Sequence, residues 1–169
     1  LGGTQSGATG LNNSGQVVGW SNLANDTVQH AFLWESGAIS DLGALGGAGQ
    51  LRLAAGINDS GQVVGVSALA NGRARGFFWQ NGAMNGLGTL GGPESSANGI
   101  NQSGQVAGWA HTALTTFGFF RVHAFAGQNG AMGDLAVPGG TDNFASGINN
   151  FGHVVGKVGV VSDFFGHNL

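Results

Sequence analysis

An eleven-residue motif occurs four times along the 169-residue chain and constrains its fold more than any other feature. Its copies start at Gly10, Gly56, Gly99 and Gly147, so the spacings between them are 46, 43 and 48 residues. A period of this length is typical of propellers and solenoids, in which one supersecondary unit packs against its neighbours. The four copies read GLNNSGQVVGW, GINDSGQVVGV, GINQSGQVAGW and GINNFGHVVGK.

A second recurring segment follows the motif and defines the repeat boundaries. It reads HAFLWESGAISDLGALGG at 30–47, RGFFWQNGAMNGLGTLGG at 75–92 and HAFAGQNGAMGDLAVPGG at 123–140. We therefore expect one repeat domain over 1–169. Its repeats are approximately 4–47, 48–92, 93–140 and 141–169, the last of them incomplete. Closure of a propeller into a ring hides its strand edges. Because the last repeat is incomplete, we expect that this sequence is part of a longer chain, or that copies of it associate edge to edge into a ring or filament.

Each repeat divides into four short runs of strand-forming residues. Asn-x-Ser-Gly separates the first two runs, and Glu-Ser-Gly or Gln-Asn-Gly separates the last two, which is the residue usage of tight hairpins. No run shows the 3.6-residue period of an amphipathic helix. The sequence predicts an all-β, β-propeller-like array of four-stranded antiparallel blades. A β-solenoid is the alternative, although its coils usually repeat at shorter intervals.

The composition excludes several classes of partner. Charged residues make up 8% of the chain and the net charge is -3, with the charges scattered rather than gathered into a basic stripe. Nucleic acid is therefore not an expected partner. No apolar run is long enough to span a bilayer, so membrane insertion is not expected either. Cysteine is absent, which removes disulfides and thiolate metal sites.

The combined motif resembles the HAF repeat, a family named for the His-Ala-Phe triplet found here at 30–32 and 123–125. The resemblance implies a bacterial repeat protein located outside the cell or on its surface, and it brings no catalytic residues with it. The chain departs from the pattern at 75–77, which reads Arg-Gly-Phe, and at Gly127, which replaces Trp34 and Trp79. These departures indicate that the triplet serves packing, since a set of ligand-binding residues would tolerate them badly.

The connection between the second and third runs varies most among the repeats, at 21–29, 67–74, 110–122 and 158–166. Variable loops on a rigid scaffold are common binding sites. The third of these connections is the longest and carries four residues that could stack on a sugar ring or anchor another protein. The alternative is that its phenylalanines extend a strand into the core. The candidate ligand-binding residues are Phe117, Phe119, Phe120 and Arg121.

Polar residues recur at two positions of the repeat and could suggest metal sites, but the residue types found there do not favour metal binding. Asn12, Asn58, Asn101 and Asn149 occupy the first turn of each repeat, but only one of the four turns has an acid, whereas calcium usually takes several carboxylates. We expect these asparagines to cap turns by bonding backbone N–H groups. His30, His123 and His167 are also equivalent, but Arg75 interrupts the set, which favours hydrogen bonding at a blade contact over zinc. No metal or cofactor site is predicted.

The function predicted from the sequence is a non-catalytic extracellular repeat scaffold or binding module. The alternative is a carbohydrate-binding lectin that uses the variable-loop face, and its partner would be a carbohydrate or another protein. A glycan hydrolase or lyase is a more distant alternative, because the chain has no Cys nucleophile and no G-x-S-x-G elbow. Among its carboxylates only Asp41 and Asp134 match in repeat position, which favours a structural role.

Overall fold

The computed structural model describes residues 1–46, 53–116, 118–138 and 140–160, and they form an all-β protein. Strands are joined in four antiparallel sheets. The first sheet contains β1 (Gly2–Leu11), β2 (Val17–Leu23), β3 (Gln29–Glu35) and β4 (Ala38–Asp41). The second contains β5 (Leu53–Ile57), β6 (Val63–Ala68), β7 (Ala74–Gln80) and β8 (Ala83–Gly86). The third contains β9 (Gly91–Ile100), β10 (Val106–Thr112), β11 (Val122–Gln128) and β12 (Ala131–Asp134).

The fourth sheet consists of β13 (Gly140–Ile148) and β14 (Val154–Val160). The first three sheets place their strands in chain order, as expected for a meander of hairpins. The all-β fold class and the four-stranded antiparallel unit are therefore confirmed for three repeats. The expected third run of the last repeat falls on 161–169, outside the described residues. The described residues also contain no helix that could cross a membrane.

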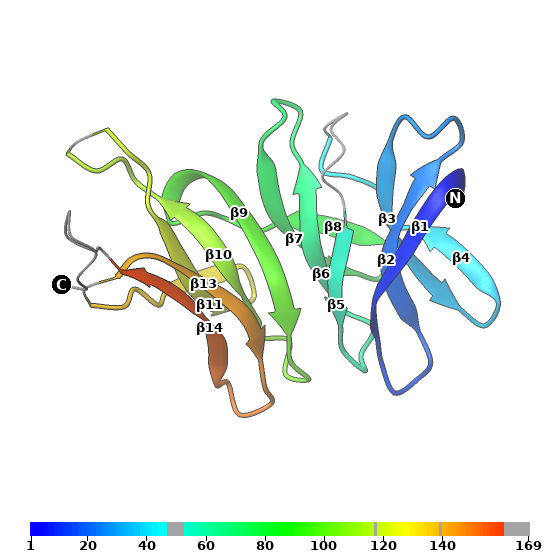
Figure 1. Ribbon diagram of the computed structural model, residues 1–169. Coiled ribbons are helices and arrows are strands. Elements are labelled where there is room, and N and C mark those ends of the chain that lie inside the picture. Colours follow the sequence, from blue (N-terminus) through cyan, green and yellow to red (C-terminus); the bar gives the residue numbers. More distant parts are fainter. Residues whose placement is uncertain (47–52, 117, 139, 161–169) are drawn as a thin grey trace.

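The four sheets follow one another across the molecule in chain order, from the N-terminal sheet to the C-terminal one (Figure 1). The first strand of each sheet packs against the preceding sheet: β5 contacts β1, β2 and β3, and β9 contacts β5, β6 and β7. In the same way β13 contacts β9, β10 and β11. Each inner sheet is thus covered on both faces, which explains why its strands are apolar at successive positions.

The core lies between the sheets and not within any one of them. One cluster joins the first and second sheets, a second joins the second and third, and a smaller one joins the third and fourth. Phe77 and Phe125 are the largest fully buried side chains, at 0% and 1% exposure, and they stand at the same position of the second and third sheets. The first cluster contains Val18, Ala31, Leu33, Leu42, Ala54, Val63 and Phe77.

The glycine inside the repeated Val-Val-Gly run is required by close backbone approach. A Cβ added at Gly65 would overlap the carbonyl oxygen of Leu53 and lie 2.9 Å from the Phe77 ring. The pairing of β5 with β6 is irregular next to this contact, between Ala54 and Gly56. An irregularity of this kind bends the strand and increases its twist, so the glycine shapes the sheet as well as admitting the neighbouring strand.

The strands start slightly earlier than the repeat boundaries drawn from the sequence. Gly91 and Gly92, the end of the second predicted repeat, begin β9, and Gly140, the end of the third, begins β13. Gly91 has φ +104°, a conformation that glycine adopts without strain. The Leu-Gly-Gly segment therefore leads directly into the first strand of the next sheet.

Candidate functional site

The four turn asparagines link each sheet to the next. Asn12 Oδ1 accepts hydrogen bonds from the backbone N–H groups of Ser14 and Gln16, at 3.1 and 3.0 Å, which closes the turn. Its Nδ2 then donates to the carbonyl oxygen of Asn58, 3.0 Å away in the second sheet. The same bond runs from Asn58 to Asn101 and from Asn101 to Asn149, each at 3.0 Å. We call this chain of turns the turn ladder.

The residue after each asparagine adds a second row of bonds to the turn ladder. The N–H of Asn13 donates to Asp59 Oδ1 at 2.9 Å, and Asn13 Nδ2 donates to Asp59 Oδ2 at 2.8 Å. These bonds, the side-chain one first, lower the pKa of the Asp59 carboxyl, because they stabilise its charged form. Amide oxygens take the same role in the later sheets: Asp59 N–H donates to Gln102 and Gln102 N–H donates to Asn150.

The equivalent histidines take part in contacts within a sheet. His30 Nδ1 lies 2.7 Å from Asp41 Oδ2, and His123 Nδ1 lies 2.8 Å from Asp134 Oδ2. Both pairs join the third strand of a sheet to its fourth, and the expected contact of these histidines between blades stays a prediction. In the second sheet Arg75 donates to the carbonyl oxygens of Leu87 and Pro93. His167 lies outside the described residues.

The predicted ligand-binding residues lie in the long connection between β10 and β11, on the surface. Phe119 is 71% exposed, and the Phe120 ring stacks on His111 with centroids 5.7 Å apart and an interplanar angle of 16°. Arg121 Nη1 donates to the carbonyl oxygen of Thr141 at 3.3 Å. Phe117 lies outside the described residues. The three described residues face the solvent and do not line the cavities described next.

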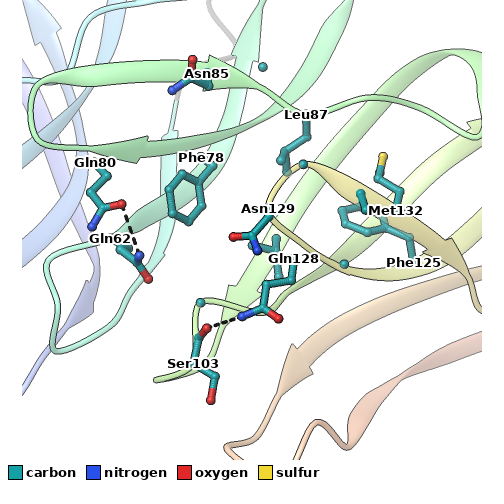
Figure 2. A pocket seen from close by; sticks show the side chains of 16 residues that line it. Gln62, Phe78, Gln80, Asn85, Leu87, Ser103, Phe125, Gln128, Asn129 and Met132 are labelled. Carbon is teal, nitrogen blue, oxygen red and sulfur yellow. Dashed lines mark hydrogen bonds between the residues drawn. The ribbon is translucent and has the colours of Figure 1, made fainter.

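A cavity of about 330 Å³ lies between the second and third sheets, on the side of the tight turns (Figure 2). Side chains of both sheets contribute to it, so it is a feature of their packing and not of one hairpin. Its lining residues are Gln62, Phe78, Gln80, Asn85, Gly86, Leu87, Ser103, Gly104, Val106, Phe125, Gly127, Gln128, Asn129, Gly130, Ala131 and Met132. We call this space the inter-sheet cavity.

The inter-sheet cavity combines apolar side chains with uncharged polar ones. Phe78 and Met132 contribute apolar surface and also pack against the core cluster of the second and third sheets. Two hydrogen bonds orient the polar residues: Gln62 Nε2 donates to Gln80 Oε1 at 3.3 Å, and Gln128 Nε2 donates to the Ser103 carbonyl oxygen at 2.6 Å (Figure 2). None of the lining residues carries a formal charge.

A departure from the repeat, Gly127 in place of tryptophan, borders the inter-sheet cavity. Trp79 of the second sheet packs against the core it shares with the first sheet. Gly127 occupies the same position of the third sheet and lines the cavity. A Cβ at Gly127 would overlap the carbonyl oxygen of Ala131, so the backbone leaves no room for a side chain there. The space that tryptophan fills in one interface is thus open in the next.

Sequence reasoning noticed Gly127 but not the cavity. The aligned repeats show the replacement of tryptophan by glycine, which indicates a packing role for the neighbouring triplet but does not by itself predict a cavity. A large-to-small replacement inside a repeat is nevertheless a signal of missing volume, because the surrounding copies show how much space the position normally fills. The polar residues that line the inter-sheet cavity give no such signal in the sequence, since they come from two different repeats.

A second cavity of about 240 Å³ borders the fourth sheet. Asn143, which is 2% exposed, lines it and accepts a bond from the Ala124 N–H at 2.8 Å. Its Nδ2 is buried without a hydrogen-bond partner among the described atoms. Lys157 Nζ lies 4.7 Å from the centroid of the Phe144 ring, so this cavity, unlike the first, has a cation in its lining.

The described ranges contain no group of three His, Cys, Asp or Glu side chains placed to hold a metal ion. Comparison with known proteins adds no assignment to either cavity. No family model, no curated protein and no solved structure matches the chain.

Proposed function

We propose that this chain is a non-catalytic repeat scaffold that binds a neutral, hydroxyl-rich ligand, such as a segment of a glycan, in the inter-sheet cavity. One observation carries the proposal. At the position where Trp79 packs in the preceding interface, Gly127 borders a cavity whose lining combines aromatic rings with uncharged amide side chains. The binding site is therefore assigned to the tight-turn side of the molecule.

The lining suits a sugar better than other small ligands. The Phe78 ring offers an apolar face for the C–H groups of a pyranose, and amide side chains supply both donors and acceptors for hydroxyl groups. Because no lining residue is charged, nothing in the cavity compensates the desolvation of a phosphate or carboxylate. The volume of about 330 Å³ falls at the lower end of the range typical of small-molecule sites.

The same lining favours binding over chemistry. Hydrolysis of a glycosidic bond usually requires two carboxyl groups, one as an acid and the other as a base or nucleophile. The residues around the inter-sheet cavity include no Asp, Glu or His. This supports a binding module over the hydrolase or lyase considered from the sequence.

The scaffold around this site is proposed to be propeller-like. Three successive four-stranded sheets, each contacting the next through its first strand, support blades over the coils of a solenoid. Together with the resemblance to the HAF repeat, this supports a location outside the cell or on its surface. Fractionation of the source cells tests the location directly, and recovery of the protein only from the cytoplasm would contradict it.

Binding is tested by a glycan array that contains neutral and acidic glycans, followed by calorimetry on the ligands that bind. The informative variant is Ser103→Phe, because Ser103 lines the inter-sheet cavity and the fourth repeat already carries Phe151 in the same turn position. This variant should cover the cavity with little change in stability. Ser60→Phe is the matched control, at the equivalent turn beside the interface that Trp79 fills.

We expect the wild-type protein and Ser60→Phe to bind a neutral glycan, and Ser103→Phe to lose at least tenfold in affinity. Absence of binding to every glycan would contradict the proposed ligand class. Equal binding by all three proteins would contradict the assignment to the cavity.

The loop between β10 and β11 is a second candidate site, because Phe119 presents a 71% exposed ring beside the stacked pair of Phe120 and His111. Replacing Phe119 and Arg121 with Ala should abolish glycan binding if the loop is the site, and should leave it unchanged if the inter-sheet cavity is. The two variants therefore assign any observed binding to one side of the molecule or the other.

A further inference from the structure

The first sheet has an exposed surface. Each later sheet buries the equivalent surface against the sheet that comes before it in the chain. Leu11 is 73% exposed, Ile39 is 45% exposed and Trp34 is 39% exposed. The residues at the same positions of the second sheet pack against the core between the first two sheets. They are Ile57, Met84 and Trp79. We call the surface formed by Leu11, Trp34 and Ile39 the leading face.

The fourth sheet exposes the complementary surface, which the earlier sheets bury against their successor. Val155 is 66% exposed. The residues equivalent to Val155 in the other three sheets are all completely buried. They are Val18, Val64 and Ala107, each at 0% exposure. We call the surface around Val155 the trailing face.

The turn ladder has a direction, and its two ends match. In every internal step the earlier sheet donates from its asparagine Nδ2 and from the following N–H, and the later sheet accepts. At the trailing end Asn149 Nδ2 lies 3.4 Å from His153 Nδ1, its one partner among the described residues. At the leading end the Asn12 carbonyl oxygen accepts one bond, from Gly15 N–H, whereas the equivalent oxygen of Asn58 accepts two.

The backbone at both ends also permits the close approach that internal interfaces use. A Cβ at Gly99 would lie 3.2 Å from the Gly147 Cα, because the first strands of the third and fourth sheets nearly touch there. A Cβ at Gly10 would lie 3.6 Å from the Gly56 Cα in the same way. Gly147 has the same position in the last sheet, and a Cβ there would meet only the side chain of Val155.

We propose that a second copy of this chain docks its leading face on the trailing face, so that the turn ladder continues from one molecule into the next. The two faces lie at opposite ends of the array, so those of one molecule do not meet (Figure 1). The contact is heterologous, with different surfaces on the two partners, and it generates a ring if the rotation closes and a filament if it does not. It is independent of any ligand in the inter-sheet cavity.

The test is analytical ultracentrifugation of the 169-residue protein and of two variants, Leu11→Glu and Val155→Glu, alone and mixed. Each variant places an uncompensated carboxylate in the proposed interface. The wild-type protein should form species larger than a dimer as its concentration rises. Each variant alone should weaken association at least tenfold. An equimolar mixture should form a one-to-one dimer and nothing larger, because each partner then supplies one intact face.

Leu114→Glu is the control, since Leu114 is 58% exposed but lies in the connection between β10 and β11. It should associate as the wild-type protein does. Thermal unfolding checks that the variants stay folded, which their exposed positions lead us to expect. A monomeric wild-type protein at millimolar concentration, unchanged association of either variant, or a mixture that stays monomeric would each overturn the proposal.

Discussion

The interface between the first and second sheets and the one between the second and third differ in their aromatic residues: Phe78 takes the place of Leu33, and Gly127 takes the place of Trp79. In the first interface Trp79 packs against the shared core. In the second interface the equivalent residue is Gly127, and a cavity of about 330 Å³ is present. The turn ladder and the buried phenylalanine are nevertheless the same in both.

The contacts that the two interfaces share hold the sheets together, whereas the residue at the position of Trp79 and Gly127 distinguishes one interface from the other. The turn ladder runs through all three interfaces and a buried phenylalanine stands in the first two, so these contacts are shared where the sheets keep their spacing. Because that spacing does not collapse where an aromatic side chain is missing, the loss leaves open space. A repeat protein can therefore contain a cavity where one interface lacks a large side chain, provided that the neighbouring interfaces keep the sheets in place.

The largest expected effect concerns the two buried phenylalanines. Phe77→Ala should destabilise the protein by about 3–5 kcal/mol, the range measured for fully buried aromatic residues. Phe125→Ala should cost less, because Phe125 already borders the inter-sheet cavity. Urea denaturation followed by circular dichroism compares the two variants. Equal losses would show that the cavity does not weaken the packing around it.

Trp79→Ala should open a space in the first interface like the inter-sheet cavity beside Gly127 in the second. Since Trp79 is only partly buried, the loss in unfolding free energy should be about 2 kcal/mol, below the range for a fully buried aromatic residue. Trp34→Ala is the matched control at the same position of the first sheet, where the side chain is 39% exposed. Its loss should be under about 1 kcal/mol, and the same denaturation experiment measures it.

The contribution of each turn-ladder asparagine to the free energy of unfolding should depend on its position in the array. Asn58→Ala removes a 1% exposed side chain that bonds its own turn and the next sheet, so it should cost about 2 kcal/mol. Asn149→Ala removes the same turn bonds but no bond to a following sheet, and it should cost about 1 kcal/mol or less. Equal costs in monomeric protein would show that the bonds between sheets contribute nothing.

The smallest effect is the pH dependence of the bond between Asp59 and Asn13. Hydrogen bonds lower the pKa of Asp59 in the folded protein, so its contribution is present at neutral pH. It is lost as the pH falls from about 4, the value in the unfolded chain, through the lowered native pKa. Asp59→Asn keeps an acceptor oxygen, as Gln102 and Asn150 do in the later sheets, and should show a shallower loss of stability in acid. Identical acid profiles for the two proteins would contradict this.

The fold could largely be predicted from the sequence because each repeat carries its own turn signals. Asn-x-Ser-Gly and Gln-Asn-Gly mark hairpins, and the apolar runs between them have the length of strands, which is local information. The candidate site could not be predicted in the same way. Gln62 and Gln128 belong to different repeats, and nothing in either segment indicates that they surround one cavity.

The sequence by itself determined the repeated hairpins, the all-β class and the position of each turn cap, because these depend on neighbouring residues in the chain. Only the tertiary structure decided which contacts the repeated residues make between one sheet and the next. The Asn12 side chain closes its own turn and also bonds the next sheet, a contact that exists only once two repeats pack together. The loss of tryptophan at Gly127 likewise becomes a cavity only because adjacent sheets hold their distance across it.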